Sequence, residues 1–183
     1  MTGDGYKVGV LGATGAVGST ILEILAERNF PAAEVIPFAS ERSAGRELEW
    51  NGSTIECRPL GPETIQGLDV VLSSAGGTVS AEWAPQLVDA GAVVVDNTSF
   101  WRMHEDVPLV VAGVNPDAAA GHKGIVANPN CTTMVMMMAL APIERAVGLE
   151  RLVVSTYQAV SGTGITSIGI ASASPCSSHR VCW

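Results

Sequence analysis

Cys131 is the residue whose setting most clearly suggests chemistry. It stands in residues 128–133 (NPNCTT), between a short apolar run at 124–127 and a helix-like stretch that begins at Met134. A thiol at the start of a helix lies at the positive end of the helix dipole, which favours the thiolate and makes the cysteine a nucleophile. Asn130 is placed to orient a substrate, and backbone N–H groups at this corner are placed to stabilise an oxyanion. We therefore interpret Cys131 as catalytic rather than structural.

A glycine-rich turn near the beginning of the chain is the second candidate site. Residues 6–11 predict a strand that runs into GATGAVG at 12–18, and residues 16–28 predict an amphipathic helix. Glycines in such a turn let the backbone approach a pyrophosphate at the helix N-terminus. A glycine turn is weak evidence alone, but its place between a strand and an amphipathic helix favours dinucleotide binding. The candidate cofactor contacts are Gly12, Thr14, Gly15, Ala16, Val17 and Gly18.

The end of the second predicted strand indicates which dinucleotide binds. Residues 39–45 read ASERSAG, and Arg42 with the hydroxyl groups of Ser40 and Ser43 suits a ribose 2′-phosphate. NADP is therefore the preferred cofactor. Glu41 supports the alternative, because an acidic side chain there can instead hold the free ribose hydroxyl groups of NAD. A solvated polar loop is the non-functional alternative.

Other polar residues follow later strands and are candidate substrate contacts. Arg102 is predicted to clamp a phosphate or carboxylate, with a surface salt bridge as the alternative. Gln158 and residues 161–164, which include Ser161 and Gly162, either meet the substrate and the nicotinamide or form a polar turn. Met134 and the methionines at 136–138 are expected in the core.

The elements that must position these residues alternate between strand and helix. This alternation predicts an α/β fold, a Rossmann-type doubly wound parallel sheet with ligands at the carboxyl ends of its strands. Asn51-Gly52 predicts a hairpin between 48–50 and 54–56, where Cys57 reads as a buried structural cysteine. A strand at 152–157 is expected to open a second domain. The remaining predicted elements are strands at 34–39, 68–74, 92–96, 107–111 and 124–127, and a helix at 80–90.

Composition excludes several classes of protein. A net charge of −8 argues against a nucleic-acid partner. The longest apolar stretch, residues 131–143, is shorter than the roughly 20 residues that span a bilayer, so no membrane partner is expected. No secretory leader is recognised, and reduced cysteines in the cytoplasm are expected. Cys176, His179 and Cys182 resemble half a zinc site, but three ligands in a tail without periodicity are read as coincidence, and no metal is predicted.

Five segments of the chain are distinctive together: 12–18 (GATGAVG), 38–45 (FASERSAG), 106–111 (DVPLVV), 128–133 (NPNCTT) and 157–162 (YQAVSG). In this combination they resemble the aspartate-semialdehyde dehydrogenase family. The resemblance covers residues 6 to about 165. One departure lies at residues 112–115 (AGVN), where the family usually carries a glutamate that touches the partner subunit.

The resemblance implies a reaction and a role for each candidate. Family members reduce L-aspartyl-4-phosphate with NADPH to L-aspartate-4-semialdehyde and phosphate, on the route to lysine, methionine and threonine. By this resemblance Cys131 attacks the acyl phosphate and Arg102 holds the phosphate. Asn130 and Gln158 position the acyl group, while Ser161 and Gly162 contact the cofactor. The family also implies a homodimer.

The resemblance also implies a domain division. Residues 1–130 form the NAD(P)-binding domain, 131–165 begin a catalytic and dimerisation domain of α+β type, and 166–183 form an atypical tail. Family members continue through a long second domain that carries a general-base histidine and a substrate-binding arginine, so the chain is expected to be truncated. One alternative is a nucleotide-binding fragment without turnover. A lower-ranked one is N-acetyl-glutamyl-phosphate reductase, which normally has glycine where this chain has Asn130.

Overall fold

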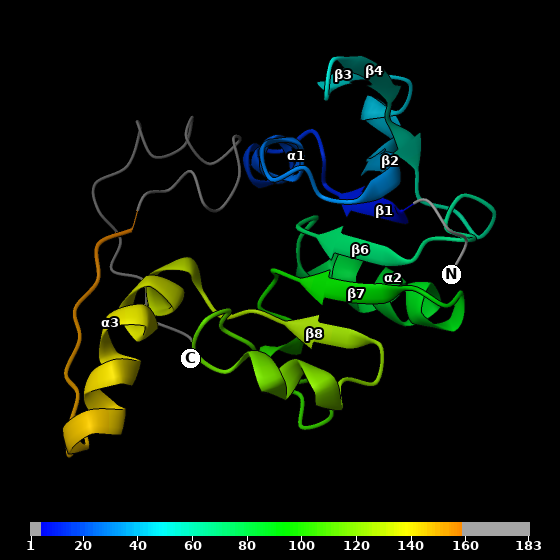
Figure 1. The fold of residues 1–183 in the computed structure, drawn as a ribbon. Helices are drawn as coiled ribbons and strands as arrows, with labels where there is room; N and C mark the ends of the chain where they lie inside the picture. The colour runs from blue at the N-terminus through cyan, green and yellow to red at the C-terminus, as the bar shows by residue number, and fades with distance from the viewer. Residues whose placement is uncertain (1–4, 159–183) are drawn as a thin grey trace, which may run out of the picture.

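The computed structural model describes residues 5–158, which build a parallel sheet covered on both faces (Figure 1). The six-stranded sheet has the order β5-β2-β1-β6-β7-β8, and every neighbouring pair is parallel. This is the predicted α/β, Rossmann-type class. Its strands are β1 (Tyr6–Leu11), β2 (Ala32–Ala39), β5 (Arg58–Pro59), β6 (Val70–Ser73), β7 (Val93–Asp96) and β8 (Ile125–Ala127).

Two helices cover opposite faces of the sheet because successive side chains of a strand point to opposite sides. Leu22 and Leu25 of α1 (Ala16–Glu27) pack with Val8 and Val10 of β1 in one core cluster. Ala84 and Leu87 of α2 (Gly77–Asp89) belong to a second cluster, which contains Leu11, Phe38, Val71 and Val94. Since β1 contributes alternate residues to the two clusters, the sheet is doubly wound as predicted.

A separate hairpin stands beside β2 (Figure 1). It consists of β3 (Glu47–Trp50) and β4 (Ser53–Glu56), which pair antiparallel. Asn51 and Gly52 both have positive φ, 49° and 75°, as a two-residue hairpin turn of this kind requires. The predicted hairpin is confirmed. Three short 3₁₀ helices complete the connections, η1 (Glu41–Ser43), η2 (Trp101–Met103) and η3 (Pro116–Gly121).

Two predicted strands are wrong. Residues 107–111 make a single parallel bridge, Leu109 to Ala127, and then turn away, because the side chain of Asn115 accepts the N–H of Val111 at 2.7 Å. Residues 152–157 form no strand and pair with no neighbour within the described part of the chain. Ser161, Gly162 and the tail at 166–183, with Cys176, His179 and Cys182, lie outside the described residues.

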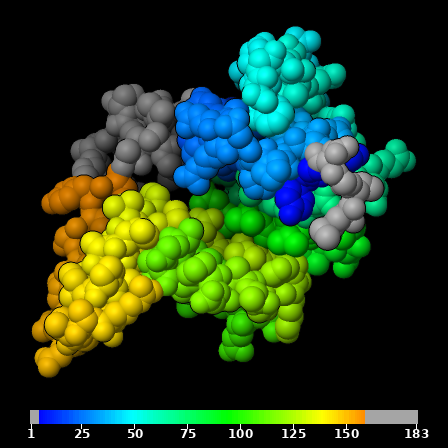
Figure 2. Space-filling view, viewed as in Figure 1, coloured from blue at the N-terminus to red at the C-terminus, as the bar shows by residue number. Residues whose placement is uncertain are grey.

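Helix α3 (Cys131–Val147) begins three residues earlier than predicted, at the cysteine itself. Asn130 caps the helix and so sets its first residue at Cys131, whereas the apolar pattern alone places the start at Met134. The expected core role of the methionines is also wrong, because Met134, Met136 and Met137 are only half-buried and Met138 is exposed. Figure 2 shows α3, in yellow, projecting from the rest of the molecule.

Within residues 5–158, no helix combines the length and the apolar character needed to cross a membrane.

Gly18 is the glycine on which the junction between β1 and α1 depends. A Cβ at this position would lie 2.1 Å from the carbonyl oxygen of Gly12 and 2.6 Å from the Cα of Ala13. We expect Gly18→Ala to lower the free energy of unfolding by about 3 kcal/mol, because backbone atoms must move to admit the methyl group. Urea denaturation measures this loss. Gly121→Ala is the matched control, since a Cβ at Gly121 meets nothing within 4 Å, and an equal loss there would contradict the explanation.

Candidate active site

The carboxyl ends of the central strands all open on one edge of the sheet. In Figure 1 the arrowheads of β6, β7 and β8 point toward the side on which α3 lies. The loops that leave this edge include residues 12–15 after β1, 40–43 after β2, 74–76 after β6, 97–102 after β7 and 128–130 after β8. Open parallel sheets bind their ligands at this edge. The fold therefore brings the cofactor candidates and the candidate nucleophile to the same side.

The glycine turn fits a bound pyrophosphate because it is a tight turn that ends at the N-terminus of α1, which has no side-chain cap. Gly12 has a φ of 76°, and a Cβ there would lie 2.8 Å from the carbonyl oxygen of Ser74. Gly15 is the N-cap of α1 and supplies no side-chain hydrogen bond. The first turn of α1 carries no acidic residue, so the N–H groups of Ala16, Val17 and Gly18 and the positive end of the helix dipole remain available to an anion. Thr14 stands within the same turn and is half-exposed.

The loop after β2 lies beside this turn. The N–H groups of Gly12 and Ala13 both donate to the carbonyl oxygen of Phe38, at 3.0 and 3.1 Å, and Ser40 follows two residues later. Arg42 and Ser43 belong to η1, and the Arg42 side chain is exposed with no ion pair among the described residues. Glu41 is exposed in the same turn. A free guanidinium at this edge is suited to an additional phosphate.

Cys131 is the first residue of α3 and is exposed. The Oδ1 of Asn130 accepts the N–H of Thr132 at 3.0 Å and its hydroxyl at 2.5 Å, so the oxygen caps the helix. The Sγ of Cys131 lies 3.8 Å from Asn130 Oδ1 and 3.9 Å from Gln158 Oε1. The structure thus brings together Cys131, Asn130 and Gln158, which sequence analysis placed in one site.

Arg102 is half-buried at the same corner and forms hydrogen bonds rather than the alternative surface salt bridge. Its Nε donates to the carbonyl oxygen of Asn128 and its Nη2 to that of Asn97, both at 3.0 Å. Burial lowers the pKa of Arg102, and the nearby acidic groups, Asp96 first, oppose this effect. A guanidinium pKa stays far above neutrality even when it is lowered, so Arg102 provides a fixed positive charge beside the thiol.

Sequence analysis missed the residues that join these loops. The Nδ2 of Asn128 donates to Asn97 Oδ1 at 2.8 Å, and the N–H of Asn128 donates to the carbonyl oxygen of Asp96 at 3.0 Å. Asp96 itself is completely buried. The available signal was a carboxylate at the end of an apolar strand, VVVD, which predicts a buried group that must find donors.

The remaining described cysteine is not part of this site. Cys57 is buried after the hairpin, as expected, and its burial raises the pKa of its thiol. Within residues 5–158 there is no cluster of His, Cys, Asp or Glu side chains arranged to hold a metal ion.

Comparisons with known proteins agree with this arrangement. Residues 7–122 match the family model for "Semialdehyde dehydrogenase, NAD binding domain". An aspartate-semialdehyde dehydrogenase of Aquifex aeolicus is 52% identical over 167 residues, which cover 90% of this chain and 49% of the relative. The chain thus spans about half the length of the curated relatives that it matches.

Solved structures give the same result. Aspartate semialdehyde dehydrogenase II from Vibrio cholerae, complexed with ASA, superposes with a TM-score of 0.78 at 48% identity, covering 80% of this chain and 49% of that one. The aspartate semialdehyde dehydrogenase from Candida albicans, with NADP, superposes with a TM-score of 0.63 at 28% identity, covering 79% of this chain and 48% of that one. The chain therefore belongs to the semialdehyde dehydrogenase family.

Proposed function

We propose that this chain is the cofactor-binding and nucleophile-bearing part of an aspartate-semialdehyde dehydrogenase. The enzyme would convert L-aspartyl-4-phosphate to L-aspartate-4-semialdehyde and phosphate, a step toward lysine, methionine and threonine. The observation that carries this proposal is an exposed thiol at the first residue of α3, with Arg102 beside it, on the sheet edge that also holds the glycine turn. The names of the relatives at about 50% identity support the same substrate.

Each residue of the corner has a role in acyl transfer. The thiolate of Cys131 attacks the carbonyl carbon of the acyl phosphate, the bond from that carbon to the phosphate oxygen breaks, and inorganic phosphate leaves with the electron pair. Arg102 binds the departing phosphate, while Gln158 and the Nδ2 amide of Asn130 hold the acyl group. Cys131 would then hold the acyl group as a thioester for reduction, and its thiolate would be the leaving group when the aldehyde is released.

NADPH is the proposed cofactor. When bound, its nicotinamide supplies the hydride. The glycine turn and the start of α1 would hold the pyrophosphate, and Ser40, Arg42 and Ser43 would hold the 2′-phosphate. Ser161 and Gly162 are proposed as further cofactor contacts. The Candida albicans relative, whose structure contains NADP, supports the choice of cofactor.

The proposed function extends to the organisation of the protein. We propose that residues 1–130 form the cofactor domain and that 131–165 begin the catalytic and dimerisation domain, in a cytoplasmic homodimer. Helix α3 supports this division, because Val135 and Val147 at 75% and 80% exposure need apolar partners that residues 5–158 do not supply.

Acyl transfer to Cys131 can be tested without hydride transfer. The chain is incubated with L-aspartyl-4-phosphate in the absence of nicotinamide cofactor and digested with trypsin. We expect an aspartyl group on the peptide that spans residues 124–145, which contains Cys131 and no other cysteine. Mass spectrometry detects the adduct, and Cys131→Ser should show no thioester there because a hydroxyl is a far weaker nucleophile.

N-Acetyl-glutamyl-phosphate provides the control substrate. A faster reaction of Cys131 with this acyl phosphate than with L-aspartyl-4-phosphate would contradict the proposed substrate. Modification of another residue, with Cys131 unmodified, would contradict the proposed nucleophile.

The choice of NADPH predicts a specific effect of Arg42. Arg42→Ala should weaken NADPH binding by about tenfold and leave NADH binding unchanged, because a hydrogen bond to a charged group contributes about 1.5 kcal/mol or more. Nicotinamide fluorescence titration measures both dissociation constants. Arg28→Ala, at the opposite end of α1, is the matched control and should change neither constant. Equal losses of NADPH and NADH binding in Arg42→Ala would argue against a 2′-phosphate contact.

A further inference from the structure

Asp96 is a completely buried carboxylate with a full set of donors. Its Oδ1 accepts the N–H of Thr98 at 2.8 Å and the Thr98 hydroxyl at 2.6 Å, and its Oδ2 accepts the hydroxyl of Ser80 at 2.5 Å. Ser80 is also completely buried, in the first turns of α2. All three partners donate to the carboxyl group, so both of its oxygens are satisfied inside the protein.

These hydrogen bonds hold the loop after β7 at both ends. At its beginning, Thr98 binds Asp96 directly, and the Thr98 hydroxyl accepts the N–H of Phe100 at 3.2 Å. At its end, the indole Nε1 of Trp101 donates to the hydroxyl oxygen of Ser80 at 2.9 Å. Ser80 therefore donates to Asp96 and accepts from Trp101, and so transmits the position of the carboxylate to the far end of the loop.

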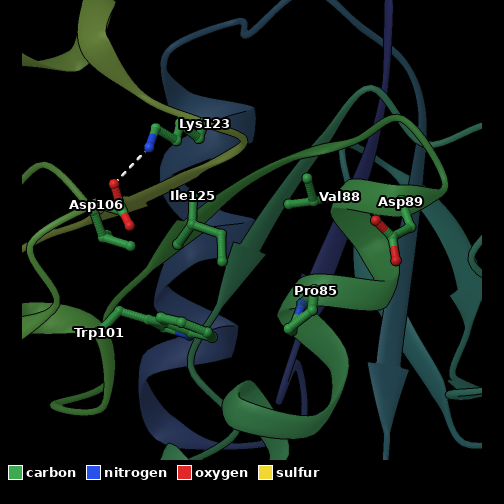
Figure 3. A pocket seen from close by; sticks show the side chains of 8 residues that line it. Pro85, Val88, Asp89, Trp101, Asp106, Lys123 and Ile125 are labelled. Atoms are coloured by element: carbon green, nitrogen blue, oxygen red, sulfur yellow. Dashed lines mark hydrogen bonds and ion pairs between the residues drawn. The ribbon is translucent and has the colours of Figure 1, made fainter.

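The Trp101 ring is held by packing and by one hydrogen bond. Its centroid lies 4.9 Å from that of Phe100 and 4.8 Å from that of His104, and the ring also packs against the core cluster around α2. The ring forms one wall of an open hollow, opposite Pro85 and Val88 of α2 and beside Ile125 of β8 (Figure 3). Asp106 and Lys123 close the rim of this hollow by pairing with each other at 2.5 Å. Phe100 and His104 belong to the same loop as Trp101, so the hydrogen bond to Ser80 is the contact that ties the orientation of the indole to α2.

Arg102 is the next residue along the chain and shares the 3₁₀ turn η2 with Trp101. Its guanidinium donates to the backbone of Asn97 and Asn128, and Asn128 stands three residues before Cys131 in the turn that leads into α3. We propose that Asp96 and Ser80 are positioning residues that, through Trp101, hold the Arg102 guanidinium beside Cys131. This inference rests on the role proposed above for Arg102 as the anion-binding side chain of the site.

The test compares two alkylating reagents at Cys131 in the 183-residue chain. Iodoacetate is anionic and iodoacetamide is neutral, and both consume the same thiolate. The ratio of their rate constants therefore cancels the thiolate fraction and reports the positive charge that meets the incoming anion. Mass spectrometry of the tryptic peptide at 124–145 follows Cys131 alone.

We expect Arg102→Gln to lower the ratio of the iodoacetate to the iodoacetamide rate by about tenfold, the lower end of the effect of charge focused in a cleft. Trp101→Phe keeps an aromatic ring and removes the donor, and Ser80→Ala removes the bridge. Each should lower the ratio by about threefold. The double variant, with both Trp101→Phe and Ser80→Ala, should lower the ratio no further than either single variant, because both changes break the same chain of hydrogen bonds.

Trp83→Phe is the matched control. Trp83 is in α2 and packs on the same core as Trp101, yet its indole makes no hydrogen bond within residues 5–158. Its ratio should equal that of the unchanged chain. An equal fall of the ratio in Trp83→Phe would show that the effect comes from a general loosening of the core, and this would overturn the proposal. If Trp101→Phe does not fold, Ser80→Ala decides alone.

The two possible failures are distinguishable. An unchanged ratio in Trp101→Phe and Ser80→Ala, with the expected fall in Arg102→Gln, overturns the positioning role and leaves the proposed function intact. An unchanged ratio in Arg102→Gln shows that Arg102 does not face the incoming anion. This result overturns both the positioning role of Asp96 and Ser80 and the anion-binding role proposed for Arg102.

Discussion

One row of paired residues across the sheet determines where the candidate site lies. The parallel register aligns Phe38 with Leu11, Leu11 with Ser73, Ser73 with Asp96, and Asp96 with Ala127. Each strand ends at this row or, in β2, one residue beyond it, and each continues as a loop on the same side. A one-residue slip in any pair would turn its side chains to the other face of the sheet and displace the loop that follows. The glycine turn, the loop that carries Arg102 and the corner that carries Cys131 therefore depend on backbone pairing before any side chain acts.

Local positive charge at this edge contrasts with the charge of the whole chain. The net charge is −8, yet the N-terminal ends of α1 and α3 both open on the carboxyl edge, and Arg102 lies between β7 and β8. Helix ends and one desolvated guanidinium act over a few ångströms, whereas distributed surface carboxylates are screened over about 10 Å. An anionic substrate can thus bind an acidic protein without a basic surface patch.

Much of this arrangement is predictable from the sequence, and the parts that are not share a physical cause. The apolar periods predict β1, α1 and a doubly wound parallel sheet, and Asn51-Gly52 predicts the hairpin. Each of these signals is local in the sequence. Residues 107–111 have the apolar pattern of a strand, but an asparagine side chain captures a backbone N–H that pairing would need. The contacts of Ser80 with Asp96 and Trp101 join residues 16 and 21 positions apart. Only the folded sheet and helix bring such groups together, so no spacing rule reveals them.

The order of the strands also governs how the cysteines respond to oxidation. Cys57 directly precedes β5 and Cys131 follows β8, and these two strands form opposite edges of the sheet. Neighbouring strands lie about 4.8 Å apart, so roughly 24 Å separate the two edges. A disulfide needs Cα atoms within about 7 Å. Peroxide that converts the exposed Cys131 thiol to a sulfenic acid therefore finds no resolving partner in Cys57, and the recovery of Cys131 depends on a thiol from outside the sheet.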